Sequence, residues 1–138
     1  MFLVMMFIVR RGEDRVLRIV GVQKNAFAEQ EFVLLQNQGS MRVALRGHVV
    51  LSECAVDAGD LGMTAHAFKD DVNVPPGLYV ILFSGHGVPR WTQTKDGAKV
   101  YKTYMGRDAG VWNRSAGPLH VLNRVHTFAD KREALLVG

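Results

Sequence analysis

The segment Glu31-Phe32-Val33-Leu34-Leu35-Gln36-Asn37 decides the fold class of this chain. It is a short apolar run that ends at Gln38-Gly39-Ser40, a cluster of turn-forming residues in which Gly39 can take a positive φ. Short apolar runs bounded by such residues are typical of β-strands. We therefore expect a strand over residues 31–37.

Similar runs recur on both sides of this segment, with Gly, Pro, Asn and Asp between them. Pro75-Pro76-Gly77 predicts a firm turn before the most apolar run, residues 78–84, which we expect to be a fully buried strand. The polar stretch 90–99 predicts a mobile loop around Trp91. Further short strands are expected at residues 15–23, 43–45, 48–51, 65–68 (within a long connection, 52–73) and near 134–137, and short strands or turns at residues 99–105, 110–113 and 118–123. No amphipathic helix longer than three turns is indicated, so the pattern favours an all-β sandwich.

The length and composition fit one domain. The chain has 138 residues, of which 48% are apolar and 22% are charged, values that are ordinary for a globular protein. The single cysteine, Cys54, excludes an internal disulfide and a multi-cysteine zinc site. We expect it to be a small packed side chain.

The first nine residues, Met1 to Val9, are all apolar. They are too few to cross a bilayer, and Arg10-Arg11 follows where a signal peptide would need small residues for cleavage. We expect residues 1–14 to form an apolar arm or an additional strand beside a domain that spans residues 15–138. The compartment is left open: Met1 as the true start favours the cytoplasm, with an extracellular or cell-surface location as the alternative.

The order of several short motifs resembles the lamin-tail domain family from about Arg15 to Val137. The segments that carry the resemblance are Glu31 to Asn37, Val43-x-Leu45-x-Gly47, Phe68, Pro76-Gly77, Tyr79-Val80, Ser84-Gly85-His86-Gly87, Tyr104, Gly106-Arg107, Val111-Trp112-Asn113, Gly117 and Leu122-Asn123. The resemblance implies an immunoglobulin-like β-sandwich of about seven to nine short strands with little or no helix. It also implies binding or scaffolding and supplies no catalytic motif.

The residues that could support catalysis or metal binding are scattered. The five histidines form no ligand pattern, although His120 and His126 could meet across a hairpin beside Asp130. Asp70-Asp71 has too few alternating oxygen ligands for a calcium loop, so a solvated turn is favoured. We therefore expect a protein that is not an enzyme and has no metal, no cofactor and no small-molecule substrate.

Positive charge is concentrated in the second part of the chain. Residues 86–138 hold nine Lys and Arg against four acids, a net of +5, whereas residues 1–85 have a net of −1. Basic residues interleaved with aromatic rings can bind anionic partners, and a solvated basic face is the simpler alternative. The candidate partner or anion site is Arg90, Trp91, Lys95, Lys99, Lys102, Arg107 and Arg114.

The two tryptophans are expected to have different roles. Trp91, in its polar stretch, is predicted to be an exposed anchor for a partner, whereas Trp112 is predicted to lie in the core with its indole N–H hydrogen-bonded nearby.

These observations predict a non-enzymatic interaction or scaffolding module that binds a macromolecular partner, protein or nucleic acid. One alternative is a nucleic-acid-binding domain that uses the same basic face. Another is a structural domain that forms homo-oligomers through the apolar arm or a sheet edge.

Overall fold

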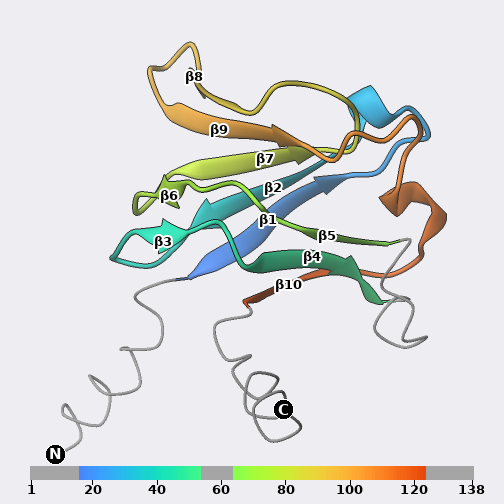
Figure 1. Cartoon of the computed structure of the whole chain (residues 1–138), viewed down its shortest axis with the longest axis horizontal. Helices are drawn as coiled ribbons and strands as arrows, with labels where there is room; N and C mark the ends of the chain where they lie inside the picture. The colour runs from blue at the N-terminus through green and yellow to red at the C-terminus, as the bar shows by residue number, and fades with distance from the viewer. Residues whose placement is uncertain (1–15, 54–63, 124–138) are drawn as a thin grey trace, which may run out of the picture.

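The computed structural model describes residues 16–53 and 64–123, and these residues form strands with almost no helix (Figure 1). Two single-turn 3-10 helices are present, η1 (Ala28–Gln30) and η2 (Trp112–Arg114). The strands are β1 (Leu17–Gln23), β2 (Phe32–Asn37), β3 (Val43–Ala44), β4 (His48–Ser52), β5 (Ala65–Ala67), β6 (Asn73–Val74), β7 (Tyr79–Phe83), β8 (Arg90–Gln93), β9 (Lys99–Tyr104) and β10 (Leu119–Asn123).

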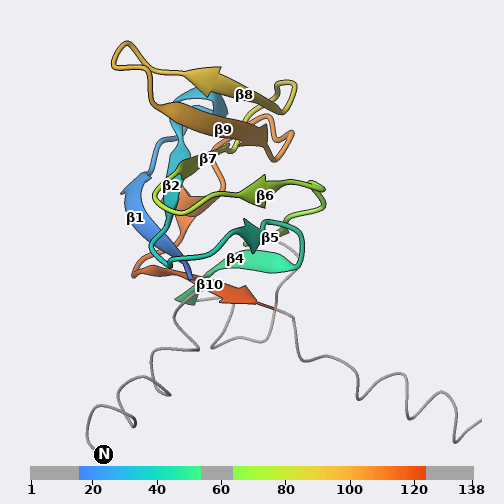
Figure 2. The ribbon, with the colours of Figure 1, turned by 90° about the vertical axis from the view of Figure 1, so that its left-hand side faces the viewer.

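The strands form three sheets arranged as two layers (Figure 2). One layer is a five-stranded sheet with the order β1-β2-β7-β9-β8. The other layer contains the three-stranded sheet β10-β4-β5 and the two-stranded sheet β3-β6. This arrangement confirms the expected all-β, sandwich-like fold. Ten strands are described rather than seven to nine, and the two that no expectation covered are the two-residue strand β6 and the exposed strand β8.

Strand pairing is antiparallel except between β7 and β9, which run parallel with Tyr79 opposite Val100. The intervening strand, β8, lies on the far side of β9 and pairs with it in antiparallel register. An irregularity between Ile19 and Gly21 shifts the register of β1 against β2.

Burial alternates along the strands of the five-stranded sheet. In β7, Val80 and Leu82 are fully buried, whereas Tyr79, Ile81 and Phe83 are half-buried. The prediction that residues 78–84 form a fully buried strand was therefore wrong. Only one face of this sheet packs against the second layer, so only every second side chain reaches the core.

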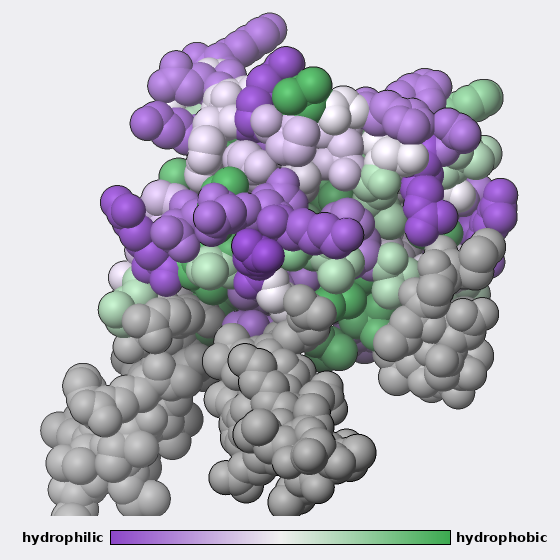
Figure 3. All heavy atoms as spheres, in the orientation of Figure 1, coloured by the Kyte–Doolittle hydropathy of each residue, from purple (hydrophilic) through white to green (hydrophobic). Residues whose placement is uncertain are grey.

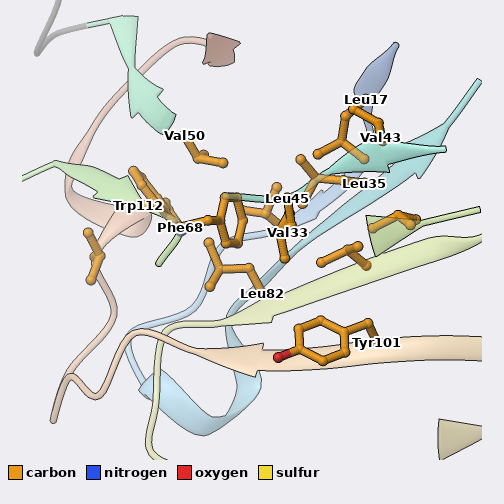
Figure 4. Packing of buried hydrophobic residues seen from close by; sticks show 13 residues of the cluster. Leu17, Val33, Leu35, Val43, Leu45, Val50, Phe68, Leu82, Tyr101 and Trp112 are labelled. Atoms are coloured by element: carbon orange, nitrogen blue, oxygen red, sulfur yellow. The ribbon is translucent and has the colours of Figure 1, made fainter. Parts of the chain in front are cut away.

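The core lies between the two layers (Figure 4). Trp112, carried by η2, is 0% exposed and packs into the same cluster as Phe68, which confirms its predicted core position. Its indole N–H was predicted to have a partner, but Trp112 Nε1 is buried without one. The cluster contains Leu17, Val33, Leu35, Val43, Leu45, Val50, Phe68, Val74, Val80, Leu82, Tyr101, Val111 and Trp112.

Several local expectations can be compared with the structure. The Pro75-Pro76-Gly77 turn is confirmed: Gly77 has φ +82°, and its N–H donates to the Asn37 carbonyl at 2.8 Å. The predicted mobile loop at 90–99 was wrong, because this stretch contains strand β8 and a tight turn that leads into β9. Gly39 has no positive φ; instead its N–H donates to Asn37 Oδ1 at 2.9 Å.

Some expectations fall outside the described residues. These are the arm at residues 1–14, Cys54 and the strand near residues 134–137. In the described part of the chain, no helix is long and apolar enough to cross a membrane.

Candidate functional site

The β8–β9 hairpin carries five of the seven residues of the candidate site. Register places Trp91 opposite Tyr101 and Gln93 opposite Lys99, while Arg90 lies opposite Lys102. Directly opposed residues share a face of the sheet, and neighbours along a strand alternate. Trp91 and Lys99 therefore lie on the face that carries the core residue Tyr101, and Arg90 and Lys102 lie on the other face. Lys95 sits in the turn between β8 and β9. The tip of this hairpin is hydrophilic and projects at the upper left of Figure 3.

Trp91 lines a surface hollow of about 540 Å³. Its side chain is 38% exposed, and its ring lies 5.3 Å from the Tyr101 ring at an interplanar angle of 59°. We call this cavity the Trp91 hollow. It is lined by Arg42, Asn73, Pro75, Leu78, Trp91, Thr92, Gln93 and Lys99.

The ring beneath Trp91 is held in place by hydrogen bonds. The Tyr101 hydroxyl donates to Asp70 Oδ2 at 2.8 Å, and the Thr103 hydroxyl donates to the same oxygen at 2.8 Å. Burial, followed by the hydrogen bond and the charge of Asp70, raises the pKa of Tyr101 well above its usual value. Tyr101 therefore stays a neutral donor and gives Trp91 a fixed surface to pack on.

The seven predicted residues do not form one continuous face. Arg107 and Arg114 line a separate hollow of about 320 Å³, which also contains Asp108 and which we call the Arg107 hollow. Arg42 was not among the predicted residues, yet it joins Trp91 and Lys99 in the Trp91 hollow. Arg42 precedes β3, far from the hairpin in sequence, and only the packing of the two layers brings it near.

The Arg107 hollow is shaped by a buried carboxylate at the start of β2. Glu31 is 0% exposed and accepts hydrogen bonds from the backbone N–H groups of Val111 at 2.6 Å, Trp112 at 3.0 Å and Asn113 at 3.0 Å. It also accepts hydrogen bonds from the Ser84 hydroxyl at 2.5 Å and the Asn25 N–H at 3.1 Å. Burial raises the pKa of Glu31, but these donors together outweigh it and hold the pKa below its ordinary value. We call this arrangement the Glu31 clasp.

Two of the histidines that the sequence singled out lie beside single carboxylates in the part of the chain that the structure describes. No group of three His, Cys, Asp or Glu side chains there could hold a metal ion. His86 Nε2 lies 2.8 Å from Asp108 Oδ1, but both side chains are exposed. His120 lies 3.6 Å from Glu53, and its suggested partners His126 and Asp130 fall outside the described residues.

The Trp91 hollow combines apolar and positively charged groups. An indole ring, the apolar atoms of Pro75 and Leu78 and the cations Arg42 and Lys99 meet in one concave site. Such a site can hold an apolar side chain between negatively charged neighbours.

Comparison with known proteins finds no relative. No protein-family model, no curated protein and no solved structure matches the chain.

Proposed function

We propose that this protein is a non-enzymatic interaction module of the lamin-tail type that binds an extended, acidic segment of a partner protein at the Trp91 hollow. The observation that carries the proposal is the exposed ring of Trp91, fixed on Tyr101 and placed in one hollow with Arg42 and Lys99. An apolar side chain of the partner occupies the hollow, and acidic side chains beside it pair with the two cations.

The free side of β8 supports an extended partner. This strand is the last of the five-stranded sheet, and among the described residues it pairs only with β9. In an antiparallel ladder, alternate residues direct their N–H and C=O groups away from the neighbouring strand. A partner segment that adds to β8 satisfies these groups and brings its alternate side chains to the hollow.

The lamin-tail part of the proposal is supported by residues 31–37, the segment on which the resemblance begins. Its two end residues, Glu31 and Asn37, have structural roles. Glu31 forms the clasp, and Asn37 is fully buried, with Nδ2 donating to the carbonyls of Met41 at 2.8 Å and Val74 at 2.9 Å. The two polar ends of the segment thus tie β2 to the segments around Val111 and Val74. A binding module needs such a rigid frame beneath its recognition surface.

Two other functions remain as alternatives. Single-stranded nucleic acid could stack a base on Trp91 and place phosphates near Arg42, Lys99 and Lys95. The partner could also be a second copy that pairs along β8. The extended protein segment is favoured because the hollow offers one ring beside Pro75 and Leu78, whereas nucleic-acid platforms offer successive rings for successive bases.

Fluorescence anisotropy of three labelled probes tests the proposal. The probes are an eight-residue peptide with one Phe flanked by Asp and Glu, the same peptide with Lys in place of the acids, and a twenty-nucleotide oligothymidine. The acidic peptide should bind. Trp91→Ala and Lys99→Glu should each weaken that binding by about tenfold or more, as expected for central aromatic and paired charged contacts.

Arg107→Glu is the matched control, because it reverses a charge in the other hollow and should leave peptide affinity within about twofold of the parent, as expected for a distant site. Tight binding of oligothymidine that Trp91→Ala abolishes would favour the nucleic-acid alternative instead. Binding of no probe, with a dimer in sedimentation that forms through β8, would favour self-association.

A further inference from the structure

The five-stranded sheet has an outer face, opposite the core. The strand register arranges the residues of this face in three rows that cross the sheet. One row crosses the sheet through Arg18, Gln36, Tyr79, Val100 and Thr92. The next row crosses through Gly21, Leu34, Ile81, Lys102 and Arg90, and the third through Gln23, Phe32, Phe83 and Tyr104.

This outer face is unusually apolar for a sheet surface that the second layer does not cover. Antiparallel sheets normally carry polar residues on their solvent-facing side. Here the residues of the two central strands alternate between core and outer face, and most outer positions of β2 and β7 are large and apolar, with no acid in any of the three rows. The large apolar residues of the face are Phe32, Leu34, Tyr79, Ile81, Phe83, Val100 and Tyr104.

The outer face also contains an apolar depression. A hollow of about 470 Å³ is lined by Leu34, Tyr79, Ile81 and Val100, together with the hairpin residues Thr92, Gln93, Thr94 and Lys102. At the other end of the face, Phe83 stacks on Tyr104 at 5.4 Å, and Phe32 meets Phe83 edge-on at 6.0 Å. Aromatic rings therefore close one end of the face and leave the end near Tyr79 hollow.

The hollow end of the face is the end where β1 begins. Arg18, the second residue of β1, belongs to the same cross-sheet row as Tyr79 and Val100. The chain before β1 therefore leaves the described structure at this end of the face, across the sheet from the part of the hollow that β8 and β9 form. The nine residues Met1 to Val9 of that preceding segment are all apolar.

Chain lengths allow this segment to reach the hollow. The seven residues from Val9 to Val16 span up to about 23 Å when extended. Crossing from β1 to β9 requires three strand spacings, or about 14 Å. Nine extended residues cover about 30 Å, which is enough to pass over the width of the sheet.

We propose that residues 1–9 bind the outer face of the same molecule's five-stranded sheet, with their side chains in the hollow formed by Leu34, Tyr79, Ile81 and Val100. The side chains of residues 1–9 carry no charge, and the lining of the hollow is mostly apolar, with the cations Arg18, Lys102 and Arg90 in the same two rows. Burial of two apolar surfaces against each other provides the driving force. The Trp91 ring itself lies on the opposite face of the hairpin, although Thr92 and Gln93 line both hollows.

Paramagnetic relaxation enhancement on the full chain tests the proposal. A nitroxide label is attached at Met5→Cys in a Cys54→Ser background, and the amide signals of ¹⁵N-labelled protein are recorded with the label oxidised and reduced. We expect the strongest broadening at Leu34, Tyr79, Ile81 and Val100, and weaker broadening at β4 and β10, which lie in the other layer. A mixture of ¹⁵N-labelled protein without nitroxide and unlabelled protein with nitroxide should show no broadening.

Substitutions on the two layers complete the test. Ile81→Lys and, independently, Tyr79→Lys should remove the broadening while the remaining amide spectrum stays folded. Leu122→Lys, the same kind of change at a 55% exposed leucine on β10, should leave it intact. Broadening confined to the mixed sample, broadening that is strongest away from the outer face, or broadening that survives both outer-face substitutions in a folded protein would each overturn the proposal.

Discussion

Glu31 Oε1 lies 2.6 Å from the backbone nitrogen of Val111, a residue 80 positions later in the chain. The same oxygen accepts a hydrogen bond from Trp112, so one carboxylate fixes the segment that inserts the largest core side chain. A buried anion that receives five hydrogen bonds is stabilised by them and becomes costly only when a partner is lost.

Replacing Glu31 by Gln should lower the free energy of unfolding by about 3 kcal/mol, because a neutral amide leaves backbone N–H donors buried without an acceptor. Chemical denaturation at pH 7 measures the loss. Glu29→Gln is the matched control, since Glu29 is exposed in η1, and it should change stability by less than about 0.5 kcal/mol. Equal effects of the two substitutions would contradict the structural role of the clasp.

Stability should fall as the pH drops below 6.5, because the buried His48 and the half-buried His66 resist protonation in the folded state. Burial lowers the pKa of His48, which its contacts with the Leu45 and Ala44 backbone only partly offset. Burial also lowers the pKa of His66, against the opposing charge of Asp70. The unfolded chain binds these protons first, so the stabilisation is complete above pH 6.5 and is lost as the pH falls through the folded-state pKa values.

Urea unfolding measured at half-unit pH steps should show this slope, up to about 1.4 kcal/mol per pH unit for each histidine. His48→Gln and His66→Gln should each reduce it. His120→Gln is the control, because its side chain is exposed on β10. Glu31 acts at lower pH, since its pKa lies below 4.5 and its stabilisation is lost only as the pH falls through that value.

The two tryptophans should respond differently to iodide. Trp91 is 38% exposed and lies in a hollow with Arg42 and Lys99, whereas Trp112 is fully buried. Iodide should therefore quench one component of the fluorescence, and Trp91→Phe should remove that component and leave a blue-shifted, unquenched emission. Two tryptophans of equal accessibility to iodide would contradict the arrangement.

Gly110→Ala should destabilise the protein by about 1 to 3 kcal/mol, the usual range for overpacking. A Cβ at this position would collide with the Asn25 carbonyl oxygen and come within 2.7 Å of Asn113 Oδ1. Gly21→Ala is the matched control, because the nearest atom to its Cβ would be Leu34 Cβ at 3.6 Å, an ordinary contact. Thermal unfolding of the two variants should separate them clearly.

Strands with an apolar side facing the core were predictable from sequence, and β2, β4, β7 and β9 were found close to their expected positions. β8 was missed because its four residues, Arg90 to Gln93, have no buried side chain, so nothing in their pattern distinguishes an end strand from a loop. The parallel pairing of β7 with β9 also leaves no local sequence pattern, since it depends on contacts between two segments that are separated in the chain by β8.

The candidate site also combines residues that could be predicted from the sequence with residues that could not. Charge counting identified Trp91 and Lys99, but alternation along the hairpin sends Arg90 and Lys102 to the other face. Arg42 enters the hollow only through the packing of the layers. From the sequence, Glu31 could be recognised only as the start of a predicted strand, because the residue type does not reveal whether a glutamate is buried or exposed. Its role depends on backbone donors from the distant segment around Val111.

The two connections on either side of β8 should differ in how readily they accept additional residues. The turn between β8 and β9 projects from the sheet, so an insertion at Lys95 or Asp96 would lengthen the hairpin without altering any other strand. The connection between β7 and β8 has no such freedom, because Gly87 lies directly against the Tyr104 ring and the Gly85 carbonyl accepts a hydrogen bond from Gly106. Related sequences should therefore vary in length at the hairpin tip and keep the connection after Phe83 constant.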